Sequence, residues 1–173
     1  SERRHVATQI AIGALRYFLL KFTRNTVIAF DLQEALSFEG ETGPYIQYAA
    51  VRASKILAKL VERGEQIPEF TQVLDAEKMG RQLASEPFWQ LLLAASKSGS
   101  ALNAALSSGE PAQMARYAFQ LAQAFNTFYQ DYPILPEKDP EKRVMLLWLA
   151  GFFQKQLQLV LERVLGIPVP EYM

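Results

Sequence analysis

The chain has 173 residues, of which 50% are hydrophobic, with 18 basic and 18 acidic side chains and no cysteine. A chain of this length is expected to form one compact domain that buries roughly 70% of its unfolded surface. The lack of cysteine excludes disulfides, zinc–thiolate clusters and thiol catalysis. The formal net charge of zero removes any general electrostatic argument for a nucleic-acid or membrane partner, so such a partner must be argued from local patterns.

The apolar segments are too short to predict a membrane span. The longest runs, such as Val144 to Phe153, are about half of the ~20 residues that a spanning helix needs. The N-terminus also lacks the pattern of a signal peptide. We therefore expect a cytoplasmic protein with no membrane partner, and nothing in the sequence indicates DNA binding.

Helical hydrophobic periodicity predicts the elements of the first part of the chain. Apolar residues recur at helical spacing from Ala7 to Phe22, and include Leu15 and Leu19. The next stretch loses this spacing and is interpreted as a buried connector with a short helical turn over Leu32 to Leu36. Proline is tolerated in the first turn of a helix, so a second helix is expected from Pro44 to Arg63. Its apolar stripe comprises Ile46, Ala49, Ala50, Ala53, Leu57, Leu60 and Val61.

The second part of the chain is also predicted to be helical. No strand-like alternation competes with the helical spacing, so the sequence predicts an all-α protein that folds as a helical bundle. The residues after Gly166 form a tail with Pro168 and Pro170, which is either disordered or docked on the bundle by Ile167 and Val169. The expected elements are a loop at Gln66–Thr71, helices at Ala76–Ala84, Glu86–Ser96, Ala101–Leu106 and Pro111–Asp131, a loop at Tyr132–Pro140, and a helix at Glu141–Leu165.

The sequence offers little support for catalysis. The single histidine, His5, lies at the N-terminal end, so neither a histidine-based triad nor a histidine-rich metal site is available. Glu39 and Glu41 are interpreted as solvated loop acids rather than as a catalytic pair. The glycines of Gly40–Gly43 follow no predicted strand, and Lys78-Met79-Gly80 lacks the rest of a nucleotide-binding signature. We predict no catalytic residue and no metal ligand.

The second helix carries a polar stripe opposite its apolar face. Aromatic rings followed by cations at helical spacing can stack a base and neutralise phosphates, as in the recognition of single-stranded RNA. The alternative is that the cations are ordinary solvated charges and that Tyr45 covers the core. On the helix at 111–131, Tyr129 lies one step off the apolar stripe, so its hydroxyl could reach the surface. The stripe comprises Tyr45, Tyr48, Arg52, Lys55, Lys59 and Glu62.

Four stretches of the sequence resemble arginyl-tRNA synthetases. The longest is Ala35-Leu-Ser-Phe-Glu-Gly-Glu-Thr-Gly-Pro-Tyr-Ile-Gln-Tyr-Ala-Ala-Val-Arg52. The others, in the same order as in the family, are Ile12-Gly-Ala-Leu-Arg-Tyr17, Ala124-Phe-Asn-Thr-Phe-Tyr129 and Leu165-Gly-Ile-Pro-Val-Pro-Glu-Tyr-Met173. The resemblance implies the C-terminal part of a class I synthetase, with a helical segment at 1–30 that follows the catalytic domain and a DALR-type anticodon-binding bundle at 31–173.

The resemblance also implies the binding residues. It predicts an anticodon pocket formed by Tyr48, Arg52, Tyr129 and Met173, and the polar stripe adds Lys55 and Lys59 as candidate contacts to the tRNA backbone. The family usually has arginine where this chain has Tyr172, which puts any salt bridge at that position in doubt.

The expected partners are an arginine-accepting tRNA and the catalytic domain of the same polypeptide. ATP and magnesium would bind to that catalytic domain, and no cofactor is expected in this chain. The start at Ser1, inside a family segment, suggests a piece excised from a longer protein, which by itself would be inactive as an arginine–tRNA ligase. An alternative hypothesis is a synthetase-like domain that lost its enzyme and acts in protein interaction or regulation.

Overall fold

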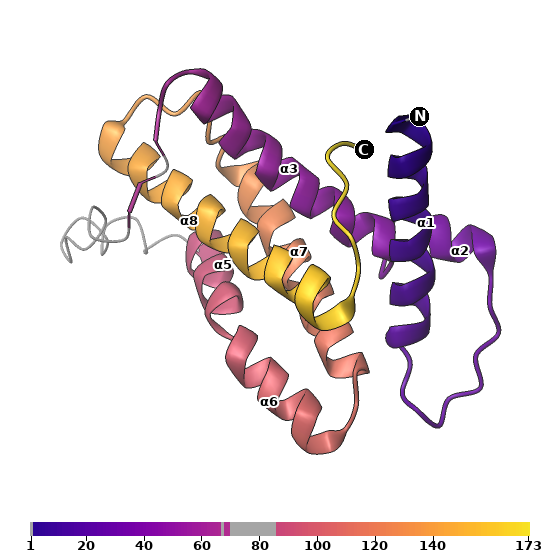
Figure 1. The fold of residues 1–173 in the computed structure, drawn as a ribbon. Helices are drawn as coiled ribbons and strands as arrows, with labels where there is room; N and C mark the ends of the chain where they lie inside the picture. Colours follow the sequence, from indigo (N-terminus) through magenta and orange to yellow (C-terminus); the bar gives the residue numbers. More distant parts are fainter. Residues whose placement is uncertain (1, 67, 70–85) are drawn as a thin grey trace.

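The computed structural model describes residues 2–66, 68–69 and 86–173. All regular elements in this part of the chain are helical, which confirms the predicted all-α fold (Figure 1). They are α1 (Glu2–Leu20), α2 (Leu32–Leu36), α3 (Gly43–Glu62), α5 (Glu86–Ser96), α6 (Ser98–Ser108), α7 (Ala112–Asp131), α8 (Pro140–Gln158) and a π-helical continuation of α8, η2 (Leu159–Leu165).

The start of α3 explains why this helix was predictable. The Thr42 side chain accepts a hydrogen bond from the backbone N–H of Tyr45 at 3.3 Å, and Pro44 follows in the first turn. Both features are typical of a helix N-terminus. The apolar stripe is buried as expected, except that Val61 is 66% exposed, although Leu60 in the same turn is completely buried.

The prediction for the first helix was partly wrong. α1 begins at Glu2 rather than near Ala7, and Leu15 and Leu19, predicted to lie on its packed face, are each 47% exposed. The buried face is instead Val6, Gly13, Ala14, Tyr17 and Phe18. α1 is apolar on two sides, so hydrophobic spacing alone could not identify the face that packs against α3.

The connector after α1 was predicted to be buried, but it is largely exposed, with Val27 96% and Phe30 50% exposed. The remaining predicted helices agree with the structure to within a few residues. α6 is longer than the expected Ala101–Leu106, and the last helix changes to π-helical geometry at Leu159. The predicted helix at 76–84 and the predicted loop at 70 and 71 lie outside the described residues. The predicted boundary near residue 30, between a helical segment and the anticodon-binding bundle, stays a prediction. In the structure, α1 packs against α3 across this boundary.

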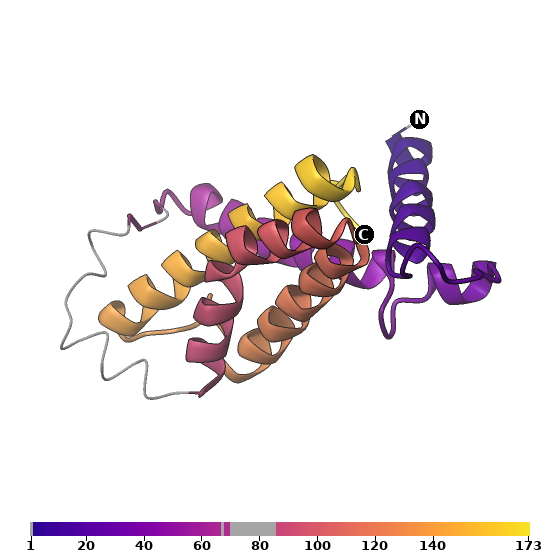
Figure 2. The same ribbon diagram turned by 90° about the horizontal axis from the view of Figure 1, so that it is seen from below.

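Helices α3, α5, α7 and α8 pack around one apolar core. At its centre the rings of Phe125 from α7 and Phe153 from α8 are stacked, with centroids 4.1 Å apart and planes 2° from parallel. Ala49 and Ala53 of α3 are fully buried, and their small side chains allow close approach of the neighbouring helices. In the two views, α1 and α2 lie at one end of this body (Figures 1 and 2).

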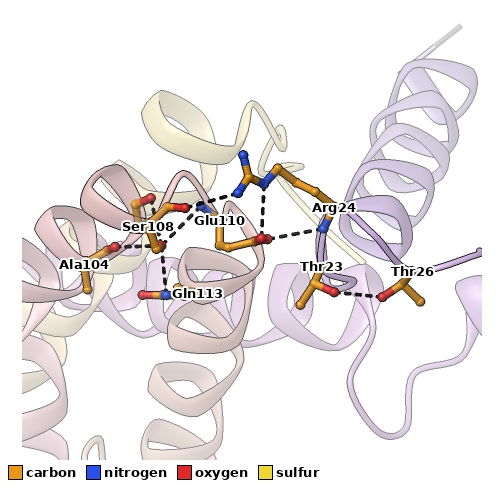
Figure 3. A network of polar contacts seen from close by, with 8 residues as sticks. Thr23, Arg24, Thr26, Ala104, Ser108, Glu110 and Gln113 are labelled. Carbon is orange, nitrogen blue, oxygen red and sulfur yellow. Dashed lines mark hydrogen bonds and ion pairs between the residues drawn. The ribbon is translucent and has the colours of Figure 1, made fainter.

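A polar network joins the loop after α1 to the turn between α6 and α7 (Figure 3). The Nε atom of Arg24 donates to Glu110 Oε1 at 3.1 Å, and Arg24 Nη2 donates to the carbonyl of Ser108 at 3.3 Å. The intervening Gly109 has a φ of 63°, the left-handed conformation that favours glycine at the end of a helix. Because the Arg24 side chain is 63% exposed, the network contributes orientation more than stability.

The segment Pro140–Leu165 has the length and mean hydropathy of a membrane-spanning helix, but 56% of its most apolar window is buried inside the bundle. The core helix of a soluble protein has the same composition. The expectation that the chain has no membrane partner therefore stays a prediction.

Stability should fall at alkaline pH because two tyrosines are buried. The Tyr117 hydroxyl donates to the carbonyl of Ala94 at 2.9 Å, and burial raises the pKa of Tyr117 from 10.0 to about 12. Burial also raises the pKa of Tyr17. Since the folded state holds these protons more tightly, their contribution is complete below pH 10 and is lost as the pH rises toward 12.

We therefore expect the free energy of unfolding, measured by urea titration, to decline over that range. Tyr117→Phe should make the decline shallower, whereas an unchanged slope in this variant would contradict the assignment.

Candidate nucleic-acid interface

A pocket of about 600 Å³ lies between α3, α7, the loop after α7 and the C-terminal tail. All six residues that the sequence singled out as tRNA contacts line it. The pocket residues are Tyr48, Val51, Arg52, Lys55, Ile56, Lys59, Tyr129, Gln130, Leu135, Tyr172 and Met173. The structure thus brings together side chains from both halves of the chain and from its last residue.

Arg52 is held between two aromatic rings. Its guanidinium carbon lies 4.7 Å from the ring centroid of Tyr48 and 5.4 Å from that of Tyr129. Its Nη1 donates to Asn126 Oδ1 at 3.0 Å. No acidic side chain within the described residues forms a salt bridge with Arg52, so its charge is oriented by the rings and the amide without being neutralised.

The two tyrosine rings are themselves fixed by packing. Tyr129 stacks on Phe125 with centroids 6.0 Å apart, and Phe125 belongs to the stacked centre of the core. Tyr48 meets Phe38 edge to face at 6.5 Å, and Tyr48 remains 38% exposed. Packing on Phe125 therefore holds the Tyr129 ring in place, and the Tyr48 ring keeps an accessible surface at the edge of the pocket.

The polar stripe of α3 divides into two parts. Lys55 and Lys59 are exposed at the pocket, and neither forms a salt bridge among residues 2–66, 68–69 and 86–173. Tyr45 is half-buried and packs on Phe119, with ring centroids 5.4 Å apart. Of the two interpretations of Tyr45, the structure favours the one in which it covers the core.

The C-terminal tail is docked, which decides between the two alternatives left by the sequence. Ile167 is completely buried and Val169 packs against the core. The tail then runs back over α3, near α1 (Figure 1). This path places Tyr172 and Met173 in the wall of the pocket.

Sequence reasoning missed several residues of this site. Asn126 and Gln130 lie one helical turn apart on α7, and Asn126 is part of the motif that ends at Tyr129, but its contact with Arg52 depends on how α7 packs beside α3. Leu135 comes from a proline-rich loop and carried no signal. Val51 and Ile56 could not be recognised as pocket residues from the sequence, because apolar residues on a helix are ordinarily assigned to the core.

The other polar groups considered in the sequence analysis, where the structure describes them, do not form part of this pocket. Glu39 is exposed, and Glu41 accepts a hydrogen bond from the Tyr17 hydroxyl at 3.2 Å. Among the described residues, no group of three or more metal-ligating side chains is close enough to hold a metal ion. Lys78-Met79-Gly80 lies outside the described residues.

Comparison with known proteins identifies the family. The sequence model of the DALR anticodon binding domain matches residues 46–173, a span that includes every residue lining the pocket. The chain belongs to the DALR anticodon binding domain family. The matched span begins inside α3 and does not cover α1, α2 or the first three residues of α3.

Relatives of the whole chain are arginine–tRNA ligases. The chain is 40% identical over 173 residues to the enzyme of Hyphomonas neptunium and 33% identical over 172 residues to that of Lactococcus lactis. These matches cover 100% and 99% of this chain but 27% and 28% of the relatives. The chain therefore corresponds to little more than a quarter of the enzymes that it resembles.

Solved structures agree with this assignment. Thermus thermophilus arginyl-tRNA synthetase superposes with a TM-score of 0.79 and 32% identity, covering 96% of this chain and 27% of that one. The Plasmodium falciparum arginyl-tRNA synthetase superposes with a TM-score of 0.74 at 24% identity, over 98% of this chain and 28% of that one. The second comparison supports the fold alone.

The pocket side chains should matter much less for stability than the core on which they rest. Arg52→Ala removes one partly buried hydrogen bond and two ring contacts but leaves no unpaired charge, so it should cost only about 1 kcal/mol. Phe125→Ala should cost about 3–5 kcal/mol because it opens a cavity in the aromatic stack. Urea unfolding of both variants tests this difference, and equal losses would mean that Arg52 is part of the structural core.

Proposed function

We propose that this chain recognises the anticodon of an arginine-accepting tRNA as the C-terminal part of an arginine–tRNA ligase. The observation that carries the proposal is the pocket, in which the guanidinium of Arg52, which forms no salt bridge with any described residue, lies between the rings of Tyr48 and Tyr129. Family membership and the arginine–tRNA ligase relatives support it.

The chemistry of the pocket suits an unstacked base. RNA is read in sequence mainly through single-stranded loops, whose bases stack on aromatic or guanidinium planes and form hydrogen bonds through their edges. Tyr48 and Tyr129 supply ring faces, and Arg52 supplies planar N–H donors beyond the one used by Asn126. Met173 adds a polarisable apolar wall. Lys55 and Lys59 are positioned to meet phosphates at the edge of the pocket.

In this proposal the chain positions tRNA and does not itself carry out the ligation. Activation of arginine with ATP and magnesium, and transfer of arginine to the tRNA, belong to a catalytic domain of the same polypeptide. No catalytic residue, metal or cofactor is assigned to the described part of this chain. The proposed location is the cytoplasm, where translation uses charged tRNA.

Substitution of Arg52 should separate base reading from phosphate attraction. Arg52→Ala should weaken binding of the cognate tRNA by about 1–3 kcal/mol and that of an anticodon-substituted tRNA much less, because only the cognate base meets the guanidinium. Lys59→Ala should weaken both tRNAs about equally, because a phosphate contact carries no sequence information. Fluorescence titrations with the two tRNAs measure both effects.

If Arg52→Ala lowered the binding affinity for both tRNAs equally, the base-reading role of Arg52 would be contradicted. An unmodified chain that binds neither tRNA would instead favour the enzyme-less interaction module that the sequence leaves open.

Binding should depend only weakly on salt. The net charge is zero and the pocket presents a short cationic surface, so few phosphates can be neutralised. We expect the logarithm of the association constant, plotted against the logarithm of the salt concentration, to have a slope of about −2 to −4. Each phosphate contact contributes roughly −0.7 to −0.9 to this slope. Titrations from low to moderate potassium chloride measure this slope. A slope near −8 would require a much larger basic surface than the one described.

A further inference from the structure

A buried glutamine connects the first helix, the third helix and the C-terminal tail. Gln47 of α3 is completely buried. Its Nε2 donates to the backbone carbonyl of Gln9 in α1 at 3.0 Å and to the backbone carbonyl of Pro168 in the tail at 2.7 Å. Both hydrogens of the amide are used, while its Oε1 has no partner among the described residues.

The space around this amide is made by two glycines. A Cβ atom on Gly13 of α1 would lie 2.3 Å from Gln47 Nε2, and a Cβ on Gly43 of α3 would lie 2.3 Å from the carbonyl oxygen of Gly13. Real Cβ atoms do not approach other atoms this closely. The crossing of α1 and α3 is therefore tight. Any side chain at Gly13 would occupy the space that the Gln47 amide fills.

The bond from Gln47 is the last directional contact of the tail. Ile167 N donates to the carbonyl of Leu161 at 2.7 Å. Beyond it, within the part of the chain that the structure describes, no hydrogen bond other than that from Gln47 reaches residues 168–173. Pro168 and Pro170 have no N–H to donate. The apolar contacts of Val169 hold the tail on the bundle, but such contacts are non-directional and do not fix its register.

We propose that Gln47 is a positioning residue for the anticodon pocket, which it holds in shape by fixing the path of the tail. Gln47 does not line the pocket, but the tail that it anchors at Pro168 ends with Tyr172 and Met173 in the pocket wall. Gln47 acts on RNA recognition through these two residues. This inference rests on the proposed function for its effect on tRNA, whereas its effect on the tail is independent of RNA.

A double-mutant cycle tests the route of this effect. Gln47→Leu removes both donors at similar size, and a shortened variant that lacks residues 171–173 removes the part of the tail in the pocket. We expect Gln47→Leu to weaken cognate tRNA binding about tenfold in the full chain and less than about twofold in the shortened chain, because residues that act through one another are not additive. Equal losses in both backgrounds, or no loss in the full chain, would overturn the proposal.

Tyr17→Phe is the matched control for loss of stability. It also removes a buried donor of α1, because the single Tyr17 hydroxyl proton is shared between the carbonyl of Ala115 in α7 at 3.1 Å and Glu41 Oε1 at 3.2 Å. It leaves the tail untouched. Tyr17→Phe should lower the melting temperature with binding of the folded protein unchanged. A loss of tRNA binding in Tyr17→Phe as large as that in Gln47→Leu would assign both effects to general destabilisation.

The tail itself can be followed without RNA. In protein with ¹³C-labelled methionine methyl groups, the Met173 signal should narrow in Gln47→Leu and lose nuclear Overhauser contacts with the other residues of the pocket. If Gln47→Leu does not fold, removing residues 168–173 from the unmodified sequence should speed hydrogen exchange of the Gln47 side-chain amide. An unchanged Met173 signal, or unchanged exchange, would overturn the proposal. Absence of tRNA binding with the Met173 change present would count against the proposed function alone.

Discussion

The close packing of α3 against α1, α7 and α8 is the constraint on which the pocket depends. One face of α3 is buried through small residues such as Ala49 and Ala53, which lets its neighbours approach closely. Once that face is fixed, the 3.6-residue repeat of the helix determines where Tyr48 and Arg52 point. Asn126 and Tyr129 of α7 then meet Arg52 because α7 packs beside the same helix.

The pocket combines a base built on the aromatic core with a wall formed by the C-terminal tail. Tyr129 rests on Phe125, which stacks on Phe153 in the centre of the core, so movement of this ring would disturb the whole bundle. The wall opposite is a tail held by apolar contacts and by Gln47. A rigid base suits the selection of one base geometry, and the tail completes the pocket as long as these contacts hold its path.

Some elements could be predicted because local sequence and tertiary packing agree. Thr42 and Pro44 mark the start of α3, and its apolar stripe is wide enough to define the buried face. The exposure of Leu15 and Leu19 could not be predicted, since α1 is apolar on two sides. The periodicity of α3 favoured Tyr48 and Arg52 as one surface, and the family resemblance joined them to Tyr129 and Met173. The roles of Asn126 and Gln47 depend on contacts between distant segments, which spacing within one helix does not reveal.

A structure of this chain with the anticodon stem–loop of an arginine-accepting tRNA tests the central claim most directly. The account predicts that one anticodon base is turned out of the loop, stacked on Tyr48 or Tyr129, with Arg52 donating to its edge and Met173 in contact with it. Lys55 or Lys59 should lie beside a phosphate. An anticodon loop bound elsewhere on the bundle, with this pocket unoccupied by RNA, would contradict the account.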